Sequence, residues 1–193
     1  HDFCMKELHG LGIERVALMD AEKDRDQVIA LFKKAGELGL FGVSIPEEYG
    51  GMGLDFNTGL LFTEALALGL SFATTVGAQV SIGSLPIVFY GTHEQKEKYL
   101  PKAISGEWHG ALAITEPHAG SDVAGIKTTA LRDGDEYVIN GSKCFITNGV
   151  SADYMVVACK TSSTGSSGIS MILVDGNSIG LSKNNLKKLG WKA

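Results

Sequence analysis

The pattern of hydrophobic residues changes once along the chain, near residue 110, and this change most constrains the fold. In the first part, apolar residues recur three and four positions apart, as helices require, for example over residues 28–38. Beyond Gly110, short β-prone runs alternate with turn residues. We therefore predict an α+β protein of two domains, an all-helical one at 1–110 and a β domain at 111–193 that is incomplete at its C-terminal end.

Capping residues predict where the helices begin and end, because they satisfy backbone groups that a helix leaves unpaired. The expected signals are capping boxes at Asp24–Gln27 and Thr92–Gln95, an N-cap at Asn57, a helix start at Ser71 and a C′ glycine at Gly39. The Asn57 helix is expected to run to Leu70.

The β half contains four apolar or β-prone runs, at 111–115, 126–149, 153–160 and 168–174. Within the second run, the pairs Asp133-Gly134 and Asn140-Gly141 are strong hairpin signals, because both pairs tolerate the positive φ angles of tight turns. We therefore expect hairpin-connected strands.

Composition and charge exclude several function classes. The 193 residues carry a net charge of −5, which argues against a nucleic-acid surface. Residues 65–92 carry no formal charge, but the Gly, Ser and Thr residues spread along them favour buried core helices over a membrane span. Three cysteines without a C-x-x-C pair indicate free thiols in a reducing compartment, and the histidine spacing shows no metal-ligand pattern.

Two polar segments of the β half are candidate ligand contacts. Residues 114–122, "ITEPHAGSD", leave an apolar run and bring hydroxyls and a glycine close together, which suits either an ordinary turn or a ligand loop. In "CFITN" (144–148), a strand would point Phe145 and Thr147 to the same face. Such a face suits a flat ring with polar edges. The pattern alone, however, favours an ordinary explanation, with Phe145 in the β core and Thr147 bonded to a neighbouring strand.

Four segments together resemble the acyl-CoA dehydrogenase family. "AITEPHAGSDVAG" (113–125) matches the family signature at every constrained position, and "NGSKCFITNG" (140–149) resembles its second flavin-contacting segment. Two segments of the N-terminal half, at 38–55 and 90–107, look like family segments in the correct order. The resemblance covers nearly the whole chain from Asp24 onwards.

The resemblance implies a fold and an activity. It implies an N-terminal helical domain, an antiparallel β-barrel-like middle domain and a C-terminal four-helix domain, usually in a homotetramer. Such enzymes oxidise an acyl-CoA thioester to the trans-2-enoyl-CoA. A glutamate removes the α proton, the β hydride passes to N5 of FAD, and electrons then go to an electron-transferring flavoprotein. The implied location is the bacterial cytoplasm or the mitochondrial matrix, without a membrane span.

The resemblance also implies site residues. The expected FAD contacts are Leu112, Ile114, Thr115, Gly120, Ser121, Phe145, Ile146 and Thr147, with Thr147 near N5. Many relatives have Trp where Phe145 stands. The expected substrate contacts are Ser121 and Ser166 for the CoA moiety, and Gln79, Val80 and Gly83 along the acyl tunnel.

The chain departs from the family pattern at its end, because no segment corresponds to the C-terminal domain that carries the base. Glu116 belongs to the loop and is not expected to replace that base, so we expect no catalytic residue in this chain. Two alternatives stay open: an acyl-CoA oxidase relative or a dehydrogenase acting on carrier-protein thioesters, and a non-catalytic binding or assembly module.

Overall fold

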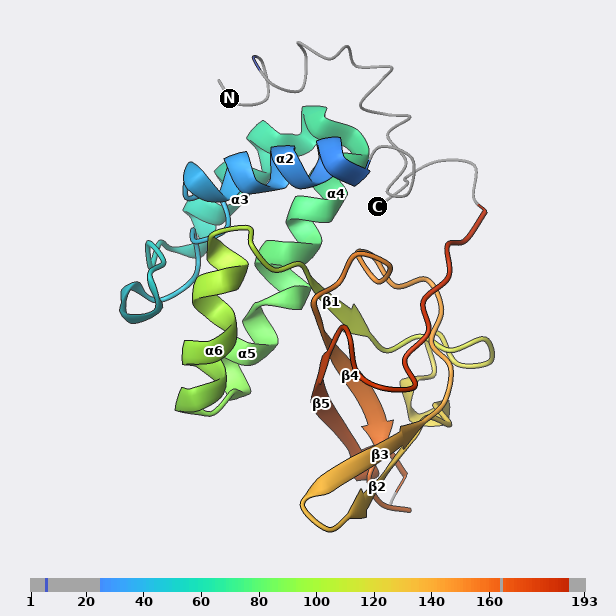
Figure 1. Ribbon diagram of the computed structural model, residues 1–193. Helices are drawn as coiled ribbons and strands as arrows, with labels where there is room; N and C mark the ends of the chain where they lie inside the picture. The colour runs from blue at the N-terminus through green and yellow to red at the C-terminus, as the bar shows by residue number, and fades with distance from the viewer. Residues whose placement is uncertain (1–5, 7–24, 164, 188–193) are drawn as a thin grey trace.

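The computed structural model describes residue 6 and residues 25–163 and 165–187 (Figure 1). The first half is helical. Its helices are α2 (Arg25–Glu37), α3 (Phe56–Leu66), α4 (Leu70–Ala78), α5 (Leu85–Tyr90) and α6 (His93–Ile104). A π-helical turn, η5 (Gln79–Gly83), joins α4 to α5. Short 3-10 turns lie at Glu47–Tyr49 and Ala67–Gly69.

The capping signals were largely informative. The Thr92–Gln95 capping box opens α6 with both reciprocal hydrogen bonds, and Gly39 takes a positive φ of 75° just after α2. The N-cap of α3 is Asp55 rather than Asn57, because the Asp55 carboxylate accepts from the backbone N–H of Thr58 at 2.9 Å. That helix ends at Leu66, not Leu70. Asp24 lies outside the described residues.

The second half is a five-stranded sheet. Its strands are β1 (Gly110–Ala113), β2 (Thr129–Asp133), β3 (Glu136–Asn140), β4 (Tyr154–Lys160) and β5 (Ile169–Asp175). The β2–β3 and β4–β5 pairs are antiparallel, and the first is a hairpin closed by Gly134 and Asp135, as predicted. Asn140-Gly141 is not a hairpin turn, since β3 ends at Asn140 and the next residues form a loop.

The expectation of an antiparallel, barrel-like sheet needs correction. Strand β4 pairs in parallel with β1 on four residues and with β2 at Lys160, so the sheet is mixed. Local hairpin signals specify only strands that follow each other, whereas β1 and β4 are 40 residues apart in the chain and meet through long-range packing. Within the described residues the sheet does not close into a barrel.

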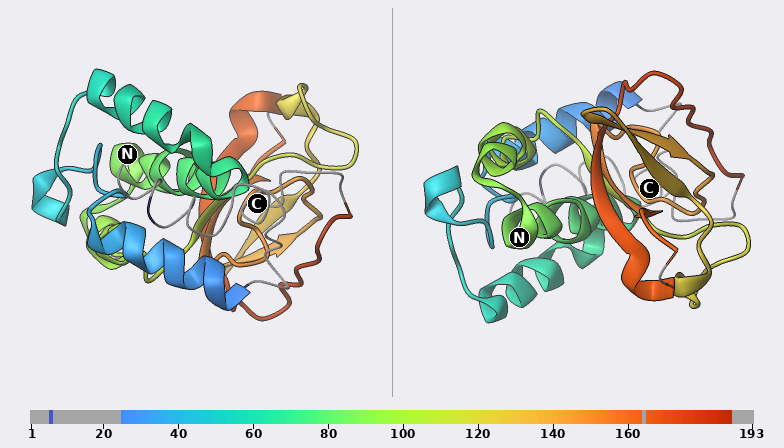
Figure 2. Two further views of the ribbon diagram at one scale, coloured as in Figure 1. Left: turned by 90° about the horizontal axis from the view of Figure 1, so that it is seen from above. Right: turned by 90° about the horizontal axis from the view of Figure 1, so that it is seen from below.

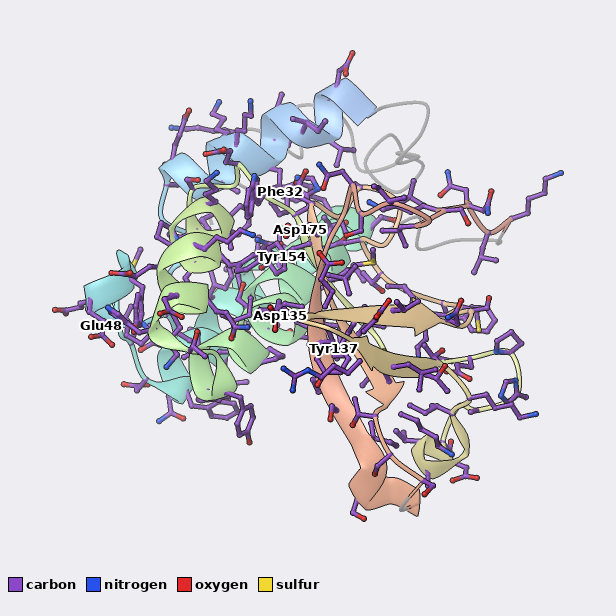
Figure 3. All side chains as sticks on the ribbon, turned by 60° about the horizontal axis from the view of Figure 1, so that its bottom comes forward. Phe32, Glu48, Asp135, Tyr137, Tyr154 and Asp175 are labelled. Carbon is purple, nitrogen blue, oxygen red and sulfur yellow. The ribbon has the colours of Figure 1, made fainter. Side chains whose placement is uncertain are left out.

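One hydrophobic cluster joins the helices to the sheet. Tyr154 and Val156 of β4 pack in a cluster with Ile87 of α5 and Leu100 of α6. Views from above and below place most of the helices on one side of the molecule and the strands on the other (Figure 2). Tyr154 and Asp175 lie where the two parts meet (Figure 3). The division at residue 110 stays a prediction, since burial here stabilises both halves together.

The uncharged stretch forms the central helices. Ser71–Tyr90 is long and apolar enough to cross a membrane by length and composition alone, and 44% of its most apolar window is buried inside the fold. The core helix of a soluble protein passes the same test. Phe72 and Val76 pack in the helical core with Phe32 and Phe41, which accounts for their apolar character.

Candidate functional site

The structure brings the two motif segments side by side. The first segment, defined here as 112–121, is β1 and the loop that follows it. The second segment, 143–148, crosses it where the backbone N–H of Cys144 donates to the carbonyl of Thr115 at 2.9 Å. The Lys143 ammonium donates to the carbonyl of Ile114 at 2.9 Å and to the carboxylate of Glu116 at 2.7 Å. Three consecutive residues of the first segment are therefore held by two of the second.

Glu116 is the centre of a buried polar cluster. Its side chain is 1% exposed, and that of its ion-pair partner Lys143 is 10% exposed. The carboxylate also accepts from the backbone N–H groups of Lys127 and Thr128, at 2.7 and 3.0 Å, and from the Thr128 hydroxyl at 2.5 Å. The His118 ring adds a contact at 3.3 Å. A buried carboxylate needs such partners, since desolvation otherwise strongly disfavours the charge.

These partners decide the protonation of Glu116. Burial by itself raises the pKa of the carboxyl, but hydrogen bonds from Lys143, Thr128 and two backbone N–H groups outweigh it and lower the pKa to about 2. Both carboxylate oxygens are already occupied by donors. Glu116 is therefore ionised at neutral pH and poorly suited to accept a substrate proton, in agreement with the expectation from the sequence.

The second segment is not the strand that the sequence predicted. Phe145 and Asn148 both take left-handed backbone conformations, with φ of 58° and 64°, which are uncommon away from glycine. The alternation argument for Phe145 and Thr147 therefore fails. The Phe145 ring is 75% exposed, so the alternative that buries it in the β core is also wrong.

Part of the second segment lines a large hollow on one face of the sheet. The hollow has a volume of about 1760 Å³, and Phe145, Ile146, Thr147 and Asn148 are among its lining residues. Asn148 is 4% exposed, and its Oδ1 atom has no hydrogen-bond partner among the described residues. A buried acceptor of this kind normally has a donor.

The first segment contributes a separate surface. Leu112, Ile114 and Thr115 are half-buried, whereas Gly120 and Ser121 are exposed. A Cβ atom added at Gly120 would meet no atom within 4 Å, so the backbone there can be approached closely from outside. None of these five residues lines the hollow. The eight predicted cofactor residues therefore fall on two surfaces that the Thr115–Cys144 crossing connects.

The three residues predicted to line an acyl tunnel lie in the π-helical turn η5. Gln79 is 0% exposed, and its amide is used within the fold. Its Nε2 donates to the carbonyls of Ala103 and Trp108, and its Oε1 accepts from the N–H of Gly110. Gln79 therefore joins α6 to β1 and presents no surface to a ligand, which corrects its predicted role.

Gly83 is also explained by packing. A Cβ atom at Gly83 would lie 3.1 Å from the carbonyl of Gly110, so glycine allows the turn to approach β1 closely. Val80 is half-buried and packs against the helical core. Ser166 lies in the short 3-10 turn Gly165–Gly168, at the loop before β5, and its side chain is outside the described residues.

Other chemistries find little support in the part of the chain that the structure describes. That part holds no group of three or more His, Cys, Asp or Glu side chains placed to bind a metal ion. Cys144 and Cys159 are free thiols, and burial raises the pKa of the Cys159 thiol. A raised pKa disfavours the reactive thiolate. Cys4 lies outside the described residues.

Sequence reasoning missed the residues that hold the site together. Lys143, Thr128 and Asn148 were given no role, although Lys143 and Asn148 fall within a quoted motif. Their partners, Glu116 and the carbonyls of Thr75 and Gly110, come from other parts of the chain. Only the fold brings these groups together. The polar character of Lys143 within a β-prone run was the one local signal.

Comparison with known proteins identifies relatives of both halves. Residues 1–107 match the family model described as acyl-CoA dehydrogenase, N-terminal domain. Residues 111–193 match the model described as acyl-CoA dehydrogenase, middle domain.

Two curated relatives and one solved structure extend this match. The chain is 39% identical over 172 residues to an acyl-CoA dehydrogenase of Bacillus subtilis, covering 88% of this chain and 45% of the relative. It is 43% identical over 173 residues to the mitochondrial isovaleryl-CoA dehydrogenase of Solanum tuberosum, covering 86% and 41%. A Bacillus anthracis acyl-CoA dehydrogenase, solved in complex with FAD, superposes with a TM-score of 0.86 at 41% identity, covering 97% and 32%. The chain thus spans less than half of the length of these relatives.

Proposed function

Because the chain belongs to the acyl-CoA dehydrogenase family, we propose that it forms the helical and β parts of a flavoprotein that oxidises an acyl-CoA thioester to the trans-2-enoyl-CoA. The single observation that carries this proposal is the crossing of the two motif segments, where Cys144 binds the carbonyl of Thr115. The crossing joins the two segments, which supports a ligand site formed by both.

The residues at the crossing fit a flavin. The exposed Phe145 ring is an apolar plate, and Thr115, Ser121 and Thr147 supply hydroxyl groups. Gly120 leaves space for close backbone approach. We propose that Leu112, Ile114, Thr115, Gly120, Ser121, Phe145, Ile146 and Thr147 hold FAD. When bound, FAD supplies the hydride acceptor. The chain's own residues bind it, orient it and shield it from water.

We propose that the α proton is removed by a carboxylate that lies outside these 193 residues. Glu116 is unsuitable, since its pKa of about 2 and its engaged oxygens make it a poor base. Glu116 fixes the loop beside the proposed flavin site instead. Ser121 remains the proposed substrate contact on the exposed loop, and Ser166 is a second.

Partners and location follow as proposals from family membership. We propose an electron-transferring flavoprotein as electron acceptor, a homotetramer as the working assembly, and the bacterial cytoplasm or the mitochondrial matrix as the location. Relatives from Bacillus subtilis and from mitochondria of Solanum tuberosum support both locations equally.

The test is the visible spectrum of the 193-residue chain titrated with FAD, followed by anaerobic addition of a short acyl-CoA. We expect bound flavin with a perturbed spectrum that the acyl-CoA does not bleach. Bleaching would show a working base within these residues and overturn the assignment of the base to another part of the protein. A stably folded chain that binds no flavin would favour the alternative of a binding or assembly module.

A further inference from the structure

We propose that Lys143, held by Glu116, is a positioning residue that fixes the segment Phe145–Thr147 in its strained conformation for the flavin. This inference rests on the proposed function, but its structural part can be measured without any cofactor. Lys143 is not proposed to touch the flavin, because its ammonium is directed to Ile114 and Glu116.

The segment is anchored at both ends. At one end, Lys143 forms a buried ion pair with Glu116 and also binds the carbonyl of Ile114. At the other end, the Asn148 amide donates to the carbonyls of Thr75 in α4 and Gly110 in β1, at 3.0 and 3.3 Å. Only three residues lie between the anchor at Lys143 and Cys144 and the anchor at Asn148. They are the proposed flavin contacts Phe145, Ile146 and Thr147.

The strained backbone at Phe145 needs the restraint that its surroundings supply. A bulky residue such as Phe145 rarely takes a positive φ, and such conformations persist only where the surroundings over-determine them. The Phe145 side chain is 75% exposed, so its own packing contributes little of that restraint. The anchors at Lys143 and Asn148 therefore supply part of that restraint, together with Ile146, which packs against the β core.

Lys143 is the anchor that connects the segment to the rest of the proposed site. Its ammonium binds the first segment at Ile114 and at Glu116, the residues on either side of Thr115. The Thr115 carbonyl itself is bound by the neighbouring Cys144 N–H. Loss of the ammonium would therefore loosen the second segment and also its register against Thr115. A ligand that contacts both segments then binds less well, since it must order them on binding.

The test compares amide hydrogen exchange of the 193-residue chain and its Lys143→Met variant. We expect exchange of the amides at 144–149 to rise about tenfold or more in the variant, while that of the β4 amides stays within about twofold. Lys98→Met is the matched control, because it removes a lysine that pairs with Asp175 at 3.3 Å elsewhere in the fold. The control should leave exchange at 144–149 unchanged.

Two results would overturn the inference: unchanged exchange at 144–149, or an equal rise in β4. If Lys143→Met does not fold, the double variant Glu116→Gln/Lys143→Met removes both charges together. It should fold and still show local loosening, and intact protection in it would count equally against the inference.

An FAD titration separates the inference from the proposed function. If the parent chain binds FAD, Lys143→Met should weaken binding about tenfold or more, and equal affinity would overturn the inference. If the parent chain binds no FAD, the proposed cofactor site fails in this chain, and the exchange measurement alone decides whether Lys143 restrains the segment.

Discussion

The side-chain oxygen of Gln79 accepts a hydrogen bond from the backbone N–H of Gly110 at 2.7 Å, which joins the turn after α4 to the first strand. Its amide nitrogen binds the carbonyls of Ala103 and Trp108 on the other side. One buried side chain thus binds three backbone groups, of which the Ala103 carbonyl also accepts from the Gly106 N–H at 3.4 Å. Gln79 therefore acts where the helical half meets the sheet.

Gln79→Leu should strongly destabilise the fold. The change removes three buried hydrogen bonds and takes the side-chain partner from the Gly110 N–H and the Trp108 carbonyl, whereas the Ala103 carbonyl still accepts from Gly106. The expected cost is ~3 kcal/mol or more in the free energy of unfolding. Urea unfolding followed by tryptophan fluorescence measures it. The control is Ser81→Ala, which removes one local hydrogen bond in the same turn. If Gln79 lined a substrate tunnel instead, the variant would keep its stability and change only ligand binding.

Acid should destabilise the fold through Glu116. Its folded pKa of about 2 lies below the unfolded value near 4.5, so its contribution is present above pH 4.5 and is lost as the pH falls towards 2. The side chains facing it are the Lys143 ammonium and the His118 ring. The shift corresponds to about 3 kcal/mol.

Urea unfolding at a series of pH values between 2 and 6 measures this loss, and the free energy of unfolding should fall by an amount of the order given above. Glu116→Gln should be less stable at neutral pH and should show a shallower loss over this window. The lowered pKa of Asp175, caused first by its hydrogen bond from Tyr99, adds a loss of the same sign. A variant that loses stability with pH as steeply as the parent would show that Glu116 is not the source.

Gly120→Ala should weaken FAD binding and leave the stability of the fold almost unchanged. The added methyl meets no atom within 4 Å, so stability should change by less than about 0.5 kcal/mol. If FAD approaches the backbone there, its affinity should fall, which fluorescence titration measures. Gly110→Ala is the contrasting variant, because its new Cβ would collide with the Tyr154 hydroxyl and destabilise the fold. Unchanged FAD affinity in Gly120→Ala would count against a flavin contact at this glycine.

Tyr99→Phe should weaken the junction of α6 with the end of β5. The Tyr99 hydroxyl donates to Asp175 at 2.7 Å, and loss of a hydrogen bond to a charged group costs about 1.5–3 kcal/mol. Thermal unfolding measures the change. Tyr137→Phe removes the same hydroxyl from a half-exposed side chain of β3 and should have little effect. Equal effects of the two variants would show that the Asp175 contact contributes nothing.

The sequence by itself determined the order of the helices and strands and the family to which the motifs belong. Helical periodicity, the Thr92–Gln95 capping box and the Gly134 hairpin are local signals, and each formed as its residues predicted. The family signature was also readable, because it is a run of adjacent residues.

Only the tertiary structure decided which strands pair and what the motif residues contact. The parallel pairing of β1 with β4, the left-handed Phe145 and the buried Glu116–Lys143 pair all depend on groups distant in the chain. Such contacts form when burial brings segments together, and no local pattern encodes them. For this reason the sequence predicted that Gln79 lines a tunnel, whereas in the fold its side chain hydrogen-bonds the backbone at the start of β1.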